Sequence, residues 1–348
     1  MMEFETYSNQ EYYGINPLSL EIGFWGGIVW VFYFLSTFYF VYIEPKIKLF
    51  ESPGMKLIFS FLLLLTCAFS AKLFVDFFKF YLPPLIYNQH IGLFTHENII
   101  LLTTIIITLS AFSALKTSFI KALSYISLFL FSLLIIIGLH IVTETISYWK
   151  YISTLAFGVI GYIDNISLFI KPMNEYHEFY MFWWFSWSLM IGKFISRFVP
   201  KGIYPLQLFL FMIIVPTVPL SIWFTICYKL YTNQANIDSG YLILMSIVGL
   251  LFMINSFDSA IRVSANLINE SIKPIKYNLS LYISYSLLLL FFISYAGLYS
   301  NTNAIIKIEH TGTLSIIIIY YILFKVISIQ HKWKALTTKK QRNKGELN

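Results

Sequence analysis

The chain alternates between long apolar stretches and short polar connections. A helix needs roughly 20 apolar residues to cross a hydrocarbon core of about 30 Å. The stretches of about this length lie at 20–43, 56–82, 97–115, 121–146, 178–198, 204–230, 240–266, 279–300 and 312–331. The pattern therefore predicts an all-α integral membrane protein with about nine transmembrane helices, in a membrane domain that covers residues 19–331.

A further apolar segment, 149–170, is a weaker candidate for a span. Asp164 and Asn165 interrupt it, and aromatic residues such as Trp149 and Tyr162 flank its apolar part. Aromatic, amphipathic helices are typical of the membrane interface. We expect this segment to form a helix at the membrane surface.

The composition agrees with a membrane protein. Hydrophobic residues make up 58% of the chain and charged residues 12%, and the mean hydropathy is +0.71. Soluble domains carry about 25% charged residues, so this composition excludes that class. The two cysteines, Cys67 and Cys227, both lie inside predicted spans and have no disulfide or zinc spacing.

The basic residues predict the orientation of the chain. The N-terminal segment, residues 1–18, contains no Lys or Arg, whereas the tail, residues 332–348, is rich in both. Basic residues flanking spans favour the cytoplasmic side. We therefore expect the plasma (inner) membrane, with the N-terminus outside and a cytoplasmic tail that contacts anionic lipid rather than nucleic acid.

The stretch 179–197 concentrates aromatic residues at a regular spacing. On a helix that turns about 100° per residue, Trp183 and Trp187 fall on nearly one face, with Trp184 beside them. Aromatic faces attract cations. Tryptophans in apolar helices also serve in packing and in interfacial belts, so the spacing alone leaves both interpretations open.

Two other predicted spans carry residues that are unusual for a membrane. The first span contains Trp25, Trp30 and Tyr33 near its outer end. The span at 240–266 contains the polar patch 252–259, whose side chains must face protein, water or an ion rather than lipid.

These segments together resemble the betaine/carnitine/choline transporter (BCCT) family, from its fourth to its twelfth helix. Residues 179–197 follow the family's eighth-helix pattern F-Y-W-A-W-W-I-S-W-S-P-F-V-G-M-F-I-A-R without a gap. Residues 24–33 are similar to the fourth-helix pattern H-W-G-x-x-x-W-x-x-Y. Residues 215–224 are similar to V-P-S-(x)5-W-F of the ninth helix, and 251–259 to F-F-V-T-S-A-D-S of the tenth.

The resemblance implies a five-plus-five inverted-repeat transporter with its substrate near the midplane. It further implies a quaternary-ammonium substrate such as glycine betaine, choline or carnitine, symport with sodium or exchange, and a homotrimer. A trimethylammonium group donates no hydrogen bond, so aromatic faces suit it. By family position the cage residues are Trp25, Trp30, Tyr33, Trp183, Trp184 and Trp187.

The family's glycine-rich third helix finds no match in the sequence, so we expect an incomplete repeat fold that lacks the family's first three helices. The only cofactor that the resemblance implies is a coupling sodium ion. The residues at the corresponding sodium positions are Thr66, Ser70, Phe252, Asn255 and Ser256. Lys193 replaces a family methionine, which raises the hypothesis that a lysine substitutes for the coupling cation.

Three interpretations of the function remain open at this point. The first is a working, truncated transporter, and the second is a transport-inactive remnant or one chain of a split transporter, with the missing helices on a separate chain. The third is a membrane-embedded transferase using His140, which we do not favour. The sequence contains no H-E-x-x-H, paired-aspartate, glycine-rich phosphate or serine-nucleophile motif.

Overall fold

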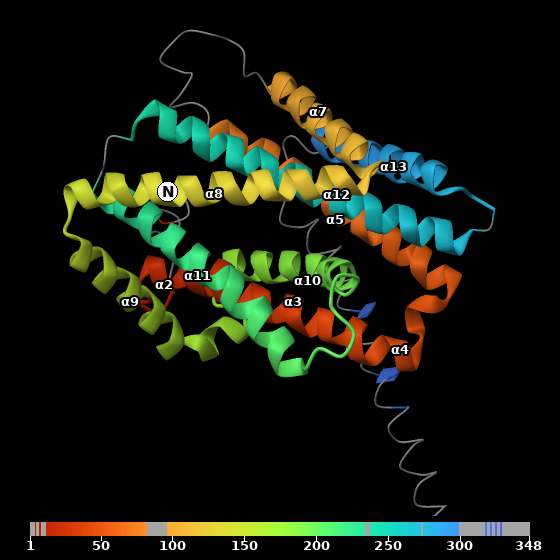
Figure 1. The fold of residues 1–348 in the computed structure, drawn as a ribbon, viewed down its shortest axis with the longest axis horizontal. Coiled ribbons are helices and arrows are strands. Elements are labelled where there is room, and N and C mark those ends of the chain that lie inside the picture. The colour runs from red at the N-terminus through yellow and green to blue at the C-terminus, as the bar shows by residue number, and fades with distance from the viewer. Residues whose placement is uncertain are drawn as a thin grey trace, which may run out of the picture.

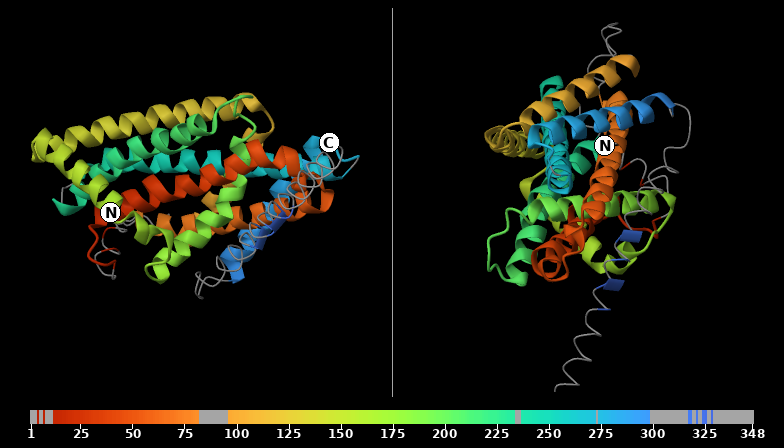
Figure 2. Two further views of the ribbon diagram at one scale, coloured as in Figure 1. Left: turned by 90° about the horizontal axis from the view of Figure 1, so that it is seen from below. Right: turned by 90° about the vertical axis from the view of Figure 1, so that its right-hand side faces the viewer.

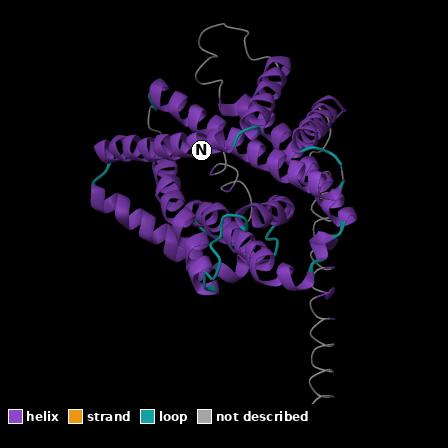
Figure 3. Ribbon diagram, turned by 45° about the vertical axis from the view of Figure 1, so that its right-hand side comes forward, coloured by secondary structure: helices purple, strands orange, loops and turns teal. Residues whose placement is uncertain are grey.

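A computed structural model describes residues 12–81, 96–233, 237–272 and 274–298, together with isolated residues at 4, 7, 317, 318, 321, 324, 325 and 328. Within these ranges every regular element is a helix, and no strand occurs (Figure 3). The predicted all-α class is confirmed.

The first long helix, residues 17–47, changes its winding along its length. It consists of α2 (Pro17–Glu21), the π-helix η1 (Ile22–Ile28), α3 (Val29–Phe38), the π-helix η2 (Tyr39–Ile43) and α4 (Glu44–Ile47). Asn16 caps its start, since the Asn16 side chain accepts the Leu18 backbone N–H at 2.9 Å, and Pro17 occupies the first turn, where no amide hydrogen is needed.

The later elements are a short 3-10 turn, η3, and a series of mostly long helices. They are η3 (Leu49–Glu51), α5 (Pro53–Tyr81), α7 (His96–Ala114), α8 (Thr117–Thr145), α9 (Tyr148–Asp164), the 3-10 helix η5 (Ile166–Ile170), α10 (Glu175–Ile195), α11 (Pro205–Thr232), α12 (Ser239–Ser271) and α13 (Tyr277–Leu298).

Helices occupy every predicted span within the described ranges, while the predicted span at 312–331 lies largely outside them. Among the described residues, six helices are long and apolar enough to cross a membrane, and α7 contributes a shorter apolar helix. The chain is therefore an all-α membrane protein, and the count of nine spans stays a prediction.

The helices pack in two groups, which are connected by α10 and by the packing of α11 on α8. Helix α12 packs against α5, α7, α8 and α13, whereas α3 packs against α10 and α11 (Figure 1). Helix α10 contacts α5 and α12 as well as α3. Figure 2 shows the long helices lying roughly side by side. The aromatic-rich core between the N-terminal helices and α10 thus lies beside the aliphatic core around α5 and α12.

A glycine allows α10 to cross α3 closely. A Cβ atom at Gly192 would lie 2.6 Å from the Ser36 carbonyl carbon and 2.8 Å from the Thr37 amide nitrogen. These contacts are with backbone, which cannot move aside as a flexible side chain can, so only glycine fits. The crossing places the tryptophans of α10 opposite those of the first helix.

A buried ion pair ties α12 to the connection between α7 and α8. The Arg262 guanidinium donates to the Asp258 carboxylate one turn earlier, and also to the backbone carbonyls of Ser113 and Lys116. Asp258 is fully buried. Each charge therefore has a partner, as a charge inside a membrane domain requires.

Helix α9 and η5 occupy the segment for which we expect a surface helix. Gly158 and Gly161 face Leu18 and Ser19 of α2, so this side of α9 lies directly on the first helix. The other side exposes apolar side chains, including Trp149 at 78%. An interfacial position for α9 stays a prediction.

Candidate functional site

The π-helix η1 sets the directions of the aromatic side chains on the first helix. An α-helix turns about 100° per residue, which would set Trp25 and Trp30 about 140° apart around the helix axis. A π-helix, with i→i+5 hydrogen bonds, turns less per residue, so η1 brings these two side chains closer to one face. The Trp30 Nε1–H donates to the Trp25 carbonyl at 3.1 Å, and the Tyr33 ring contacts Trp30 edge to face at 5.5 Å.

Two tryptophans of α10 share one hydrogen-bond acceptor on α5. The indole N–H groups of Trp183 and Trp187 donate to Ser70 Oγ at 3.0 and 2.9 Å. The Ser70 hydroxyl donates in turn to the Thr66 carbonyl at 3.0 Å. A hydroxyl has one donor and two acceptor lone pairs, so Ser70 is fully used in holding these two indoles.

Trp184 lies on a different side of α10 and is 1% exposed. Its ring stacks on Tyr180 at 6.0 Å and 26°, and it contacts Phe24 and His177. Trp25 meets Trp184 and Trp183 edge to face at 6.0 and 5.6 Å. Trp184 therefore backs the wall that Trp25 and Trp183 form.

A cavity of about 540 Å³ lies between the first helix, α5, α10 and α12, and all six predicted cage residues border it, with Trp184 almost wholly covered by its neighbours. The same cavity is also lined by four of the predicted sodium residues, Ser70, Phe252, Asn255 and Ser256. The fifth, Thr66, is not part of the lining. No charged side chain is among the described residues of this lining. The structure thus brings four segments distant in sequence to one apolar, aromatic cavity.

Local hydrogen bonds use several oxygens of the predicted sodium residues. Ser256 Oγ donates to the Phe252 carbonyl at 2.9 Å, and Asn255 Nδ2 donates to Ser127 Oγ at 2.8 Å. Asn255 Oδ1 and Thr66 Oγ1 are buried and have no hydrogen-bond partner among the described residues. Of these two atoms, only Asn255 Oδ1 belongs to a residue that lines the cavity, and a sodium site here stays a prediction.

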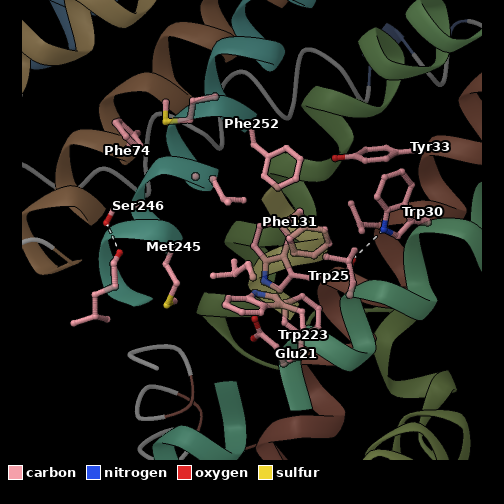
Figure 4. Close-up of a pocket in the computed structure, with 18 residues that line it drawn as sticks. Glu21, Trp25, Trp30, Tyr33, Phe74, Phe131, Trp223, Met245, Ser246 and Phe252 are labelled. Atoms are coloured by element: carbon pink, nitrogen blue, oxygen red, sulfur yellow. Dashed lines mark hydrogen bonds between the residues drawn. The ribbon is translucent and has the colours of Figure 1, made fainter. Parts of the chain in front are cut away.

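A second cavity, of about 580 Å³, adjoins the first (Figure 4). Both cavities have Trp25, Trp30, Tyr33, Phe74, Phe252 and Met253 in their walls. Beyond that shared wall, the second cavity is lined by residues that include Trp223 of α11, Phe131 of α8 and Glu21 of α2.

The sequence reasoning missed two residues of the second cavity's wall, Glu21 and Trp223, and one residue behind the walls, Tyr180. Glu21 is an acidic residue inside an apolar stretch, which is itself a signal of function because charges in spans are costly. Trp223 stands in the segment that matches the family's ninth helix. No sequence signal marked Tyr180 as the residue that stacks on Trp184.

His177 lies in the first turn of α10 and packs against the aromatic core. It precedes the predicted span at 178–198, is fully buried, and lies 4.5 Å from the Phe24 ring. Its Nδ1 accepts the Met173 backbone N–H at 3.1 Å. Burial lowers the pKa of His177 to about 4, so the ring is neutral at physiological pH.

The other charged candidates lie outside both cavity walls. His140 is exposed on α8, 3.3 Å from Glu144, and lines neither cavity. The Lys193 ammonium lies 5.1 Å from the centre of the Phe40 ring and is likewise not part of either lining. Neither His140 nor Lys193 is therefore placed to contact a molecule that is bound between the tryptophans.

Comparison with known proteins gives one further observation. No known family model matches the chain. A stretch of 124 residues is 29% identical to glycine betaine transporter 1 of Vibrio parahaemolyticus, and it covers 33% of this chain and 22% of that protein. The match thus spans less than a quarter of the relative's length. The chain is a helical membrane protein with similarity to a transporter.

Proposed function

We propose that this chain binds a quaternary-ammonium compound of the glycine betaine, choline or carnitine type and carries it across the plasma membrane. One observation carries the proposal: a single cavity is lined by Trp25, Trp30 and Tyr33 of the first helix and by Trp183 and Trp187 of α10, with Trp184 behind them. The similarity to a transporter whose name specifies glycine betaine supports it.

The chemistry of the cavity suits such a ligand. A trimethylammonium group has no N–H and so donates no hydrogen bond, but its charge is attracted to aromatic faces. Each desolvated contact contributes about 2 kcal/mol, and three contribute about 6 kcal/mol. A dissociation constant of 1 μM corresponds to about 8 kcal/mol. We therefore expect affinities between micromolar and millimolar.

The first experiment measures binding by isothermal titration of the purified chain with tetramethylammonium. Trp183→Ala is expected to weaken binding at least tenfold, because Trp183 lies in the cavity wall. Trp149→Ala is the matched control, since Trp149 is exposed on α9. Equal loss in both variants, or no binding by the wild type, would contradict the proposal.

Uptake into proteoliposomes separates the alternatives. Binding with uptake supports a working transporter, whereas binding without uptake supports an inactive remnant or a chain that needs a partner carrying further helices. Replacing sodium by potassium in the same assay tests coupling, for which Thr66 Oγ1 and Asn255 Oδ1 are candidate oxygens because both lack a hydrogen-bond partner among the described residues.

The proposal includes an orientation and an assembly. The tail 332–348 is basic and segment 1–18 is not, which favours an outer N-terminus and a cytoplasmic tail. A homotrimer follows from the family resemblance. Cysteine labelling from each side of the membrane and the mass of the detergent-solubilised complex test these two points.

A further inference from the structure

A threonine of α11 is hydrogen-bonded to the π-helix η1. The Thr217 hydroxyl donates to the carbonyl of Gly26, inside η1. Threonines in these helices commonly donate to the carbonyl four residues earlier in their own helix, as Thr37 and Thr225 do at 2.8 Å. The bond from Thr217 instead joins two helices, and α11 also packs directly on η1 (Figure 1).

Two successive carbonyls of η1 accept side-chain donors. The Gly26 carbonyl accepts the Thr217 hydroxyl, and the Trp25 carbonyl accepts the Trp30 Nε1–H at 3.1 Å. A carbonyl pairs with the N–H four residues later in an α-helix and five residues later in a π-helix, which is the rarer arrangement. A donor held on a neighbouring helix stabilises the winding that directs the carbonyl towards it. The bond from Thr217 therefore favours the π-helical form of this window.

The donor stands in an irregular part of its own helix. Thr217 lies between Pro216 and Pro219 of α11. Proline has no amide hydrogen and its ring clashes with the carbonyl four residues earlier, so an interior proline interrupts the regular hydrogen bonds of a helix. The regular α-helical pattern is thus interrupted in both partners, and the bond between Thr217 and Gly26 connects the two irregular segments.

The winding of η1 decides where two cage residues lie. Trp25 and Trp30, which flank Gly26 in sequence, line both cavities, whereas Thr217 lines neither. If the same seven residues of η1 were wound as an α-helix, Trp25 and Trp30 would lie about 140° apart around the helix axis. The two rings would then leave their present places in one wall. Thr217 can therefore affect a ligand only through the residues that it positions.

We propose that Thr217 is a positioning residue for ligand binding. Its bond to the Gly26 carbonyl holds η1 in the π-helical winding, and this winding keeps Trp25 and Trp30 in the wall of the cavities. The inference rests on the proposed function, because it concerns the same aromatic cage. It adds a residue outside the cage, on another helix, on which the geometry of the cage depends.

Titration with tetramethylammonium tests the role in binding. Thr217→Val removes the hydroxyl and keeps the shape, and it is expected to weaken the affinity about fivefold or more, whereas Thr217→Ser keeps the hydroxyl and should stay within about twofold. Thr225→Val is the matched control, since Thr225 is a buried threonine of the same helix that bonds within α11 and lines neither cavity. Equal losses in Thr217→Val and Thr225→Val would overturn the proposal.

A second measurement reports the winding without a ligand. Incorporation of 5-fluorotryptophan gives the full chain one fluorine resonance for each of its eight tryptophans, and the resonance of Trp30 is the one lost in Trp30→Phe. Thr217→Val is expected to shift this resonance, because the Trp30 ring changes its surroundings. Thr217→Ser and Thr225→Val should leave it in place. An unshifted Trp30 resonance in Thr217→Val would overturn the proposal.

The two measurements separate this inference from the proposed function. Wild-type protein that binds no tetramethylammonium contradicts the proposed function, while the fluorine spectrum still decides whether Thr217 holds the winding of η1. A shifted Trp30 resonance with unchanged affinity contradicts the positioning role and leaves the cage as a binding site. Thr217→Ala also removes the hydroxyl, and it replaces Thr217→Val in both measurements if that variant does not fold.

Discussion

The Ser70 hydroxyl of α5 accepts the indole N–H of Trp187 on α10 at 2.9 Å, across 117 positions of sequence. The same oxygen accepts the indole N–H of Trp183. One serine on a neighbouring helix thus fixes the orientation of two rings of the cavity wall. This orientation matters because a cation is attracted to the face of a ring and not to its edge.

Ser70→Ala is predicted to loosen both rings. The substitution leaves two partly buried indole N–H groups without an acceptor, and an unpaired donor costs at most about 1–3 kcal/mol when it is fully buried. We expect a lower unfolding temperature and a several-fold weaker affinity for tetramethylammonium, measured by thermal denaturation in detergent and by titration. Ser153→Ala on the exposed side of α9 is the control. Unchanged affinity in Ser70→Ala would show that the serine does not position the rings.

The ion pair between Asp258 and Arg262 gives a prediction about stability. Arg262→Met removes the partner of a fully buried carboxylate, which typically costs about 3–5 kcal/mol. Replacing both residues, as in Asp258→Leu with Arg262→Met, is expected to recover part of the loss. Lys48→Met is the control, because the Lys48–Glu51 pair is exposed. A double variant less stable than Arg262→Met would contradict this account.

His177 gives a prediction about pH. Burial lowers its pKa to about 4 from an ordinary value of 6.5, so the unfolded chain binds a proton more readily than the folded chain between these values. Stability is therefore full above about pH 6.5 and falls as the pH approaches 4, by up to about 3 kcal/mol. Protonation would also break the bond in which Nδ1 accepts the Met173 amide.

Thermal denaturation as a function of pH measures this effect. His177→Phe is expected to flatten the profile between pH 6.5 and 4, whereas His140→Gln, at an exposed position, should keep the wild-type slope. The same slope in all three proteins would mean that other groups govern the acid response.

The sequence predicted the helices well because each apolar stretch is nearly as long as a bilayer is thick. It also placed Trp183 and Trp187 on one face, since 100° per residue is a property of any α-helix. The structure agrees, because both indoles reach Ser70.

Other features depend on contacts between helices, or on the number of residues per turn of a helix, and the sequence of a single segment does not specify these. The acceptor role of Ser70 requires α5 to lie against α10, and nothing in either segment alone specifies this pairing. Trp184 was predicted beside its neighbours, and the structure buries it behind Trp25 because Tyr180 and Phe24 fill the space around it. The π-helix η1 was missed, since Gly26 and Gly27 are compatible with an α-helix as well.

The winding of η1 makes the cavity depend on the number of residues in this window as well as on their identity. Loss of one residue from Ile22–Ile28 would allow an ordinary α-turn, because a π-turn is closed by an i→i+5 hydrogen bond and an α-turn by an i→i+4 bond. The helix on either side would keep nearly its present orientation, since the extra residue of a π-turn is offset by its smaller rotation per residue. Proteins that share this cavity but have an ordinary α-helix in this window should therefore have one residue fewer between the positions of Trp25 and Trp30.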